Sequence, residues 1–237
     1  MNPGGGLSES ELGYARDMDD PAQAPTRLLP DVHALAGEEE YGYRSFAYVV
    51  VFDGFSLLID VSHRRFIPEL VPFPPPRYLL LTHRHTRRDE AEYERHFGLR
   101  VFLRAEDALA MRRGPAANTP MAQSYGDPFT DPHLAELGFR FLHAPGHTAG
   151  YTFILWNRHD GVLFSGDAVI GRPKDAPPDA PALTFPPEDT SDDDAHMRAS
   201  VAALEVPAVR HVLPFHGDPC IDLTPSRFIE LWQGVLR

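Results

Sequence analysis

The sequence is short of cysteine and of long apolar runs. Cys220 is the one cysteine among 237 residues. A single cysteine excludes an internal disulfide framework and a thiolate-rich zinc site, so any metal must be held by histidine and carboxylate ligands. No apolar run approaches the roughly 18 residues of a membrane span. Residues 1–25 also lack the apolar segment of a signal peptide. We therefore expect a cytoplasmic protein without membrane contact.

Basic residues are scarce relative to acidic ones. Lys and Arg number 22 against 34 Asp and Glu, which gives a formal net charge of -12. A field of this sign repels polyanions, so nucleic acid and anionic membranes are disfavoured as partners. A small-molecule substrate is the expected partner, and composition does not distinguish a monomer from an oligomer.

Proline, in contrast, is abundant. The chain has 24 prolines, and ten of them cluster in segments 71–77 and 171–194, which we interpret as loops. Residues 1–26 are rich in Gly, Pro and acidic residues and show no hydrophobic periodicity, which predicts a flexible N-terminal arm. The 43% hydrophobic content of the chain suits a packed core. We therefore expect one globular domain over residues 27–237.

Apolar segments alternate with polar or amphipathic ones along this domain. Strands are predicted at about 46–52 and 55–60, separated by Asp53-Gly54, a dipeptide typical of tight turns. RYLLLTH predicts a buried strand. Helices are predicted, in chain order, in TRRDEAEYERHFG, AEDALAMRR, residues 192–205 and TPSRFIELWQGVLR. Strands mixed with helices in both halves predict an α/β sandwich in which helices cover two packed sheets.

Four predicted strands end in a short loop that carries a possible metal ligand. LLLTHRH ends in His83 and His85, and FLHAPGHT ends near His147. VLFSGD ends in Asp167, and HVLPFHG contains His216. Loops at the carboxyl ends of strands converge on one edge of an α/β fold. Imidazole and carboxylate groups suit zinc, so the pattern predicts a metal site.

Each of these motifs is weak when taken alone. A His-x-His pair often arises by chance, and Asp is a common turn residue after a strand. PGHTAG is more specific, because Gly146 and Gly150 permit a tight turn that presents His147 while Thr148 orients it. The occurrence of all four motifs in one order makes coincidence a poor explanation.

The order THxH, PGHTxG, FSGD, LPxHG resembles the metallo-β-lactamase-fold hydrolase superfamily, which includes glyoxalase II, lactonases, phosphodiesterases and flavodiiron oxygen reductases. The resemblance runs from about Leu29 to Gly217 and includes SLLID, an early strand ending in Asp. It implies a single-domain α/β fold, a four-layer αββα sandwich with the metal site at one edge. It further implies a first metal on His83, His85 and His147, a bridging Asp167, and His216 at a second metal.

The sequence departs from the family pattern at one point. The usual run is His-x-His-x-Asp-His, whose Asp and last His belong to the second metal. Arg87 and Arg88 occupy these positions here. Cations do not ligate a dication, and their charge disfavours one nearby.

Three interpretations of this departure are open. The chain binds one metal only; or the loop is two residues longer, so that Asp89 and Glu90 replace the missing pair; or the site is vestigial and binds another ligand or none. We favour a retained metal, because Asp167 and His216 would have little role together in a dead site. One and two metals stay equally open.

The resemblance implies a metal-dependent hydrolase. Zinc is the expected cofactor, as one or two ions, with iron or manganese as alternatives. Zinc with an open position lowers the pKa of its water toward about 7, and the metal-bound hydroxide attacks a small ester, thioester, lactone or phosphoester. Asp167 and Asp89 are the predicted catalytic residues. Arg87 and Arg88 are predicted to bind a carboxylate or phosphate of the substrate, the alternative being arginines on the solvent face of a helix start.

A second functional hypothesis is a catalytically degenerate domain of the same fold with a binding or regulatory role. The proline-rich segment 171–194 lies between Asp167 and His216, where relatives carry substrate-shaping insertions, and is interpreted as a lid. Metal content would separate the two hypotheses first.

Overall fold

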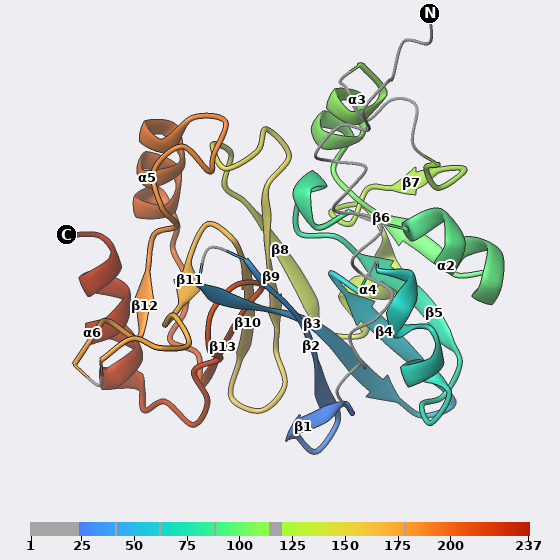
Figure 1. The fold of residues 1–237 in the computed structure, drawn as a ribbon, viewed down its shortest axis with the longest axis horizontal. Coiled ribbons are helices and arrows are strands. Elements are labelled where there is room, and N and C mark those ends of the chain that lie inside the picture. The colour runs from blue at the N-terminus through green and yellow to red at the C-terminus, as the bar shows by residue number, and fades with distance from the viewer. Residues whose placement is uncertain (1–23, 41, 62, 88, 114–119, 178) are drawn as a thin grey trace, which may run out of the picture.

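The computed structural model describes residues 24–40, 42–61, 63–87, 89–113, 120–177 and 179–237. Two β-sheets lie between two groups of helices (Figure 1). No helix in these ranges is long and apolar enough to cross a membrane.

The first sheet has seven strands, which lie side by side in chain order. They are β1 (Thr26–Leu29), β2 (Val32–Glu40), β3 (Tyr43–Phe52), β4 (Phe55–Ile59), β5 (Pro76–Leu80), β6 (Arg100–Phe102) and β7 (Tyr125–Gly126). The pairs from β1 to β4 are antiparallel. The pairs from β4 to β7 are parallel, so β5 and β6 end at the same edge of the sheet.

The second sheet has four strands in the order β13-β10-β9-β8. They are β8 (Phe139–His143), β9 (Thr152–Trp156), β10 (Val162–Gly166) and β13 (His211–Pro214). Strands β10 and β13 are parallel, whereas the other pairs are antiparallel. A small separate hairpin pairs β11 (Ile170–Gly171) with β12 (Leu183–Thr184).

Helices cover the outer face of each sheet. Helices α2 (Glu90–Phe97) and α3 (Ala105–Arg113) belong to the first sheet, and α5 (Asp194–Ala203) and α6 (Pro225–Val235) to the second. The short α4 (Pro132–Glu136) precedes β8. Single 3-10 turns, η1 (Arg64–Phe66), η2 (Pro68–Leu70) and η3 (Arg84–Thr86), complete the described elements.

Alternation along the strands creates three apolar layers. In β3, Tyr48 and Val50 join the cluster between the sheets, while Val49 joins the cluster under α2 and α3. In β9, Trp156 faces the inter-sheet cluster, while Phe153 packs with Trp232 of α6. Because successive strand residues face opposite sides, apolar runs such as YVVVF are buried on both faces. The predicted four-layer αββα sandwich is confirmed.

Most element predictions are confirmed with shifted boundaries. Helix α6 begins after its N-cap Thr224, whose side chain accepts the Arg227 N–H. The helix expected from Thr86 begins at Glu90, because residues 84–86 form η3 instead. Strand β2 was not predicted, since its end is acidic. Most of the predicted N-terminal arm, residues 1–23, lies outside the described residues, and the domain boundary at residue 27 stays a prediction.

Candidate metal centre

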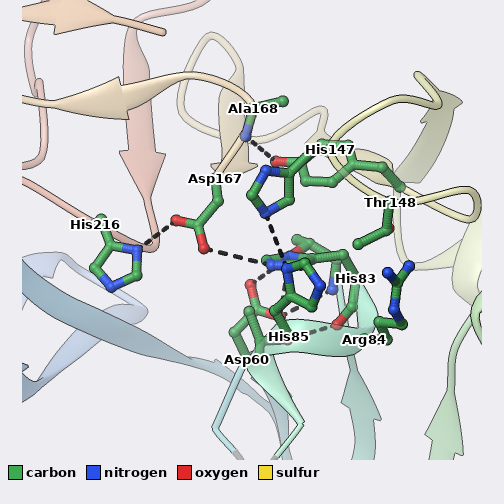
Figure 2. Close-up of polar contacts among 12 residues, drawn as sticks. Asp60, His83, Arg84, His85, His147, Thr148, Asp167, Ala168 and His216 are labelled. Atoms are coloured by element: carbon green, nitrogen blue, oxygen red, sulfur yellow. Dashed lines mark hydrogen bonds and ion pairs between the residues drawn. The ribbon is translucent and has the colours of Figure 1, made fainter. Parts of the chain in front are cut away.

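Three of the predicted ligands meet at one edge of the two sheets. His83 and His85 follow β5, and His147 lies in the loop between β8 and β9 (Figure 2). One ring nitrogen from each lies within 4.8 Å of the other two. His83 and His147 are buried, whereas His85 is exposed. This arrangement leaves room for one ion with access from solvent.

The hydrogen bonds of His83 fix which nitrogen faces the cluster. Its Nδ1 lies 3.0 Å from the Thr82 hydroxyl oxygen. That hydroxyl donates its hydrogen to the Asp60 carboxylate, 2.9 Å away, and therefore accepts from His83. The proton thus sits on Nδ1 and leaves a lone pair on Nε2. His83 Nε2 is buried and makes no hydrogen bond to the described residues, as expected of an atom that awaits a metal.

His147 is oriented in the same way by a different loop. Its Nδ1 lies 3.0 Å from the Ser191 hydroxyl oxygen. Ser191 donates to the sulfur of Met197 at 3.4 Å, so it accepts from the His147 Nδ1–H. The Nε2 of His147 then faces the cluster, 3.4 Å from His85 Nδ1.

A buried aspartate ties the two ligand loops together. Asp107 of α3 is fully buried. Its carboxylate accepts the backbone N–H and the guanidinium of Arg84, between His83 and His85, at 2.9 and 3.3 Å. It also accepts the Thr148 hydroxyl at 2.7 Å and the Gly150 N–H at 2.8 Å, in the loop of His147. One side chain thus sets the distance between the loops that carry all three histidines.

Asp167 lies beside this cluster at the end of β10. Its Oδ2 is 3.4 Å from His83 Nε2, and its Oδ1 is 2.7 Å from His216 Nδ1. Gly166 precedes it with a φ of 53°, and a Cβ there would lie 2.5 Å from the Tyr151 hydroxyl. That hydroxyl accepts the Ala168 N–H at 2.7 Å. Glycine is therefore required for the turn that points Asp167 at the histidines.

The titration behaviour matches a site for a cation. Burial, with His83, lowers the pKa of His147 to about 2, and burial with His83 and Arg84 lowers that of His85 to about 4. Burial alone would raise the pKa of Asp167, but His216 and His83 hold it well below its usual range. His85 and His147 are therefore neutral imidazoles and Asp167 is an ionised carboxylate at neutral pH, the forms of these groups that bind metal.

His216 has a different environment. Burial alone would lower its pKa, but Asp167 and Glu40 outweigh it and raise the pKa to about 9. The Glu40 carboxylate lies 3.8 Å from His216 Nε2. Glu40 ends β2, and the backbone of the following strand pairs with the His216 segment, Phe46 N–H donating to Phe215 O at 2.6 Å.

The structure places the other predicted site residues away from the three histidines. The Asp89 carboxylate accepts the Arg64 N–H at 3.0 Å. Glu90 is fully buried and accepts from Arg87 Nε at 2.5 Å and from the Tyr125 hydroxyl at 2.7 Å. Arg87 is thus held by a buried partner on its own helix start. Arg88 lies outside the described residues.

A pocket of about 390 Å³ opens beside the cluster. One wall carries His85, His147 and Asp167, with His216 and Glu40 beyond them. Pro186, Pro187, Asp189 and Thr190, from the proline-rich segment interpreted as a lid, also line the pocket. None of the described lining residues is Lys or Arg.

Several supporting residues escaped the sequence analysis. In the sequence, Asp107 is an ordinary acidic residue in the first turn of a helix, and Ser191 is an ordinary serine in a loop. Glu40 lies more than 40 residues before the first ligand in the sequence and had no motif of its own. Only Asp60 carried a signal, as the Asp that ends SLLID.

Solved structures share this architecture. A metallo-beta-lactamase family protein from Thermus thermophilus matches with 21% identity and a TM-score of 0.58, covering 88% of this chain and 80% of that chain. A metallo-beta-lactamase from Pontibacter korlensis matches with 17% identity and a TM-score of 0.61, covering 90% and 99%. One from Cronobacter sakazakii, described by a HARLDQ motif, matches with 18% identity and a TM-score of 0.56, covering 82% and 81%.

No family model and no curated protein matches the sequence. The likeness is therefore one of structure, and it extends over most of both chains. It agrees with the two packed sheets and the outer helices. The chain has the metallo-β-lactamase fold.

Proposed function

We propose that the chain is a metal-dependent hydrolase whose cofactor is zinc. The observation that carries this proposal is His83 Nε2, a buried nitrogen without a hydrogen bond to the described residues, surrounded by His85, His147 and Asp167. Leaving such an atom unpaired costs free energy unless a ligand satisfies it. Three imidazoles and a carboxylate match the donor set that zinc prefers.

Two of the proposed ligands, His83 and His147, have a neighbouring residue that prepares them. Thr82 and Ser191 keep the protons of His83 and His147 on Nδ1, so that Nε2 is ready to bind. Asp167 supplies the negative charge. When bound, a divalent ion would supply Lewis acidity to a carbonyl or phosphoryl oxygen at this end of the pocket.

The pocket supports a small substrate. Its lining includes the apolar Ile170 and Phe215 and the prolines Pro186 and Pro187, which would contact the body of such a substrate. Esters, thioesters, lactones and phosphoesters fit the proposal, and Asp167, which lines the same pocket, is the proposed catalytic carboxylate. We do not include Asp89 as a catalytic residue, because its carboxylate is engaged by the Arg64 backbone.

Zinc titration of the metal-free full-length chain by calorimetry tests the proposal. We expect tight binding that His85→Ala weakens at least about 100-fold, since even an outer partner of a ligand is worth 10- to 100-fold. His133→Ala on α4, an exposed histidine that pairs with Glu136 and is not part of the cluster, is the control and should bind as the unmodified chain does. Undetectable zinc binding would overturn the proposal.

Turnover separates the proposed hydrolase from the second candidate, a degenerate binding domain. That candidate is favoured by one observation, the engagement of Asp89, Glu90 and Arg87 elsewhere. A panel of thioester, lactone, ester and phosphodiester substrates should show zinc-dependent hydrolysis of at least one class. Tight zinc binding without hydrolysis of any class would support the binding domain instead.

A further inference from the structure

Of the ligands that the family pattern gives to a second metal, Asp167 and His216 are present, whereas Arg87 and Arg88 stand where the pattern has Asp and His. The residues considered for it in the sequence were Asp89 and Glu90. Glu90 is fully buried in a pair with Arg87, and the guanidinium of Arg87 also donates to the Pro120 carbonyl. The Asp89 carboxylate is held by the Arg64 N–H. Releasing Glu90 would leave the buried Arg87 guanidinium without its buried carboxylate partner, which is strongly unfavourable.

Asp167 uses its two oxygens for different partners. Oδ2 faces His83 Nε2 at 3.4 Å, on the side of the three-histidine cluster. Oδ1 accepts from His216 Nδ1 at 2.7 Å. Oδ1 is thus engaged by a protein donor, whereas Oδ2 faces the histidine cluster (Figure 2). The same bond turns the other nitrogen of His216 away from Asp167.

Glu40 lies on that other side of His216. Its carboxylate is 3.8 Å from Nε2, and its side chain is 35% exposed, so it faces the pocket. The β2–β3 hairpin carries it there, because Gly217 N–H donates to Arg44 O at 2.8 Å and joins the hairpin to the His216 loop. His216 therefore lies between two carboxylates: Nδ1 is hydrogen-bonded to Asp167, and Nε2, which makes no hydrogen bond to the described residues, is 3.8 Å from Glu40.

We infer that this centre takes a single divalent ion, and that His216, clamped between Asp167 and Glu40, occupies the place of a second one. The inference rests on the proposed metal-dependent function. In it, His83, His85, His147 and Asp167 Oδ2 bind the ion. His216 lines the pocket as an imidazole beside the ion and is a positioning residue for Asp167, not a ligand.

Metal counting tests the inference without measuring activity. Metal-free full-length protein is saturated with Zn²⁺, freed of excess by gel filtration, and analysed for zinc per chain. We expect one equivalent for the unmodified chain, for Glu40→Gln and for His216→Asn. Two equivalents in the unmodified chain would overturn the inference. Two equivalents that fall to one in Glu40→Gln would also overturn it and would identify Glu40 as a ligand.

Histidine ¹⁵N chemical shifts give a second readout on the same samples. On addition of Zn²⁺, three histidines should take the shifts of metal-bound imidazole, and His216 should keep those of a hydrogen-bonded ring. A metal-bound shift for His216, identified by its loss in His216→Asn, would contradict the inference. Absence of any bound zinc would be a different result, since it removes the proposed function and leaves no centre to count.

Discussion

At the scale of single residues, Asp107 has the strictest hydrogen-bonding requirement of the residues that support the site. A carboxylate with no exposure accepts four hydrogen bonds from two loops that are far apart in the sequence. The amide of Asn offers one acceptor oxygen and a donor group that meets other donors. Asp107→Asn should therefore lower the free energy of unfolding by about 3 kcal/mol. It should also weaken zinc binding about 10- to 100-fold, because both histidine loops lose their common anchor.

The neighbouring acid on the same helix is the matched control for Asp107. Glu106 pairs with Arg104 near the surface, with its side chain 40% exposed. Glu106→Gln should change the free energy of unfolding by less than about 1 kcal/mol and leave zinc affinity unchanged. Urea unfolding and zinc calorimetry on both variants make the comparison. Equal effects of the two substitutions on zinc affinity would show that Asp107 does not position the ligands.

At the scale of elements, the segment before α5 serves the pocket and the ligands together. Residues 186–190 form the pocket wall, and Ser191 holds His147. The backbone N–H groups of Asp192 and Asp193 donate to the carbonyls of His147 and Gly146 at 3.1 and 3.0 Å. The segment is therefore a fixed support for the His147 loop.

Removing the Ser191 hydroxyl isolates one part of this support. Ser191→Ala should weaken zinc binding about 10-fold, because His147 then selects its tautomer without help. The unfolding free energy should fall by about 1 kcal/mol, the typical value of one hydrogen bond. Thr190→Val, which removes the adjacent hydroxyl that donates to Pro187 O, is the control. Unchanged zinc affinity in Ser191→Ala would assign the segment a role in the pocket wall only.

Sequence periodicity predicted the strands, the outer helices and the strand-end ligands because these depend on local patterns. The apolar run YLLL predicts a buried strand, and His83 and His85 follow it in the next loop. Their position at the end of a strand can therefore be inferred from the local sequence. The supports of the ligands depend on tertiary contacts instead. Asp107 meets Thr148 across 41 residues, and Tyr125 meets Glu90 across 35. No periodicity encodes such pairs, so the sequence left the number of metals open.

At the scale of the whole molecule, the shifted histidines predict how stability depends on pH without metal. His85 and His147 have folded-state pKa values of about 4 and about 2, below the ordinary 6.5. Their contribution is complete above pH 6.5 and is lost as the pH falls, because the unfolded chain then binds more protons. His216 has a folded-state pKa of about 9. Its contribution is complete below pH 6.5 and is lost as the pH rises through 9.

The lowered histidine pKa values reduce stability below pH 6.5, and the raised pKa of His216 reduces it above pH 6.5. The urea midpoint of the metal-free protein should therefore be highest near pH 6.5 and fall on both sides. The fall should be steeper on the acid side, where the lowered pKa values of His33, His85, His147 and His211 act together, than on the alkaline side, where His216 is the described histidine whose pKa is raised. His216→Gln should flatten the stability curve between pH 6.5 and 9. It should leave the acid side of the curve unchanged, because the pKa values of the other shifted histidines are lowered and act only there. A midpoint that stays constant from pH 6.5 to 9 in the unmodified chain would contradict the clamped state of His216 between Asp167 and Glu40.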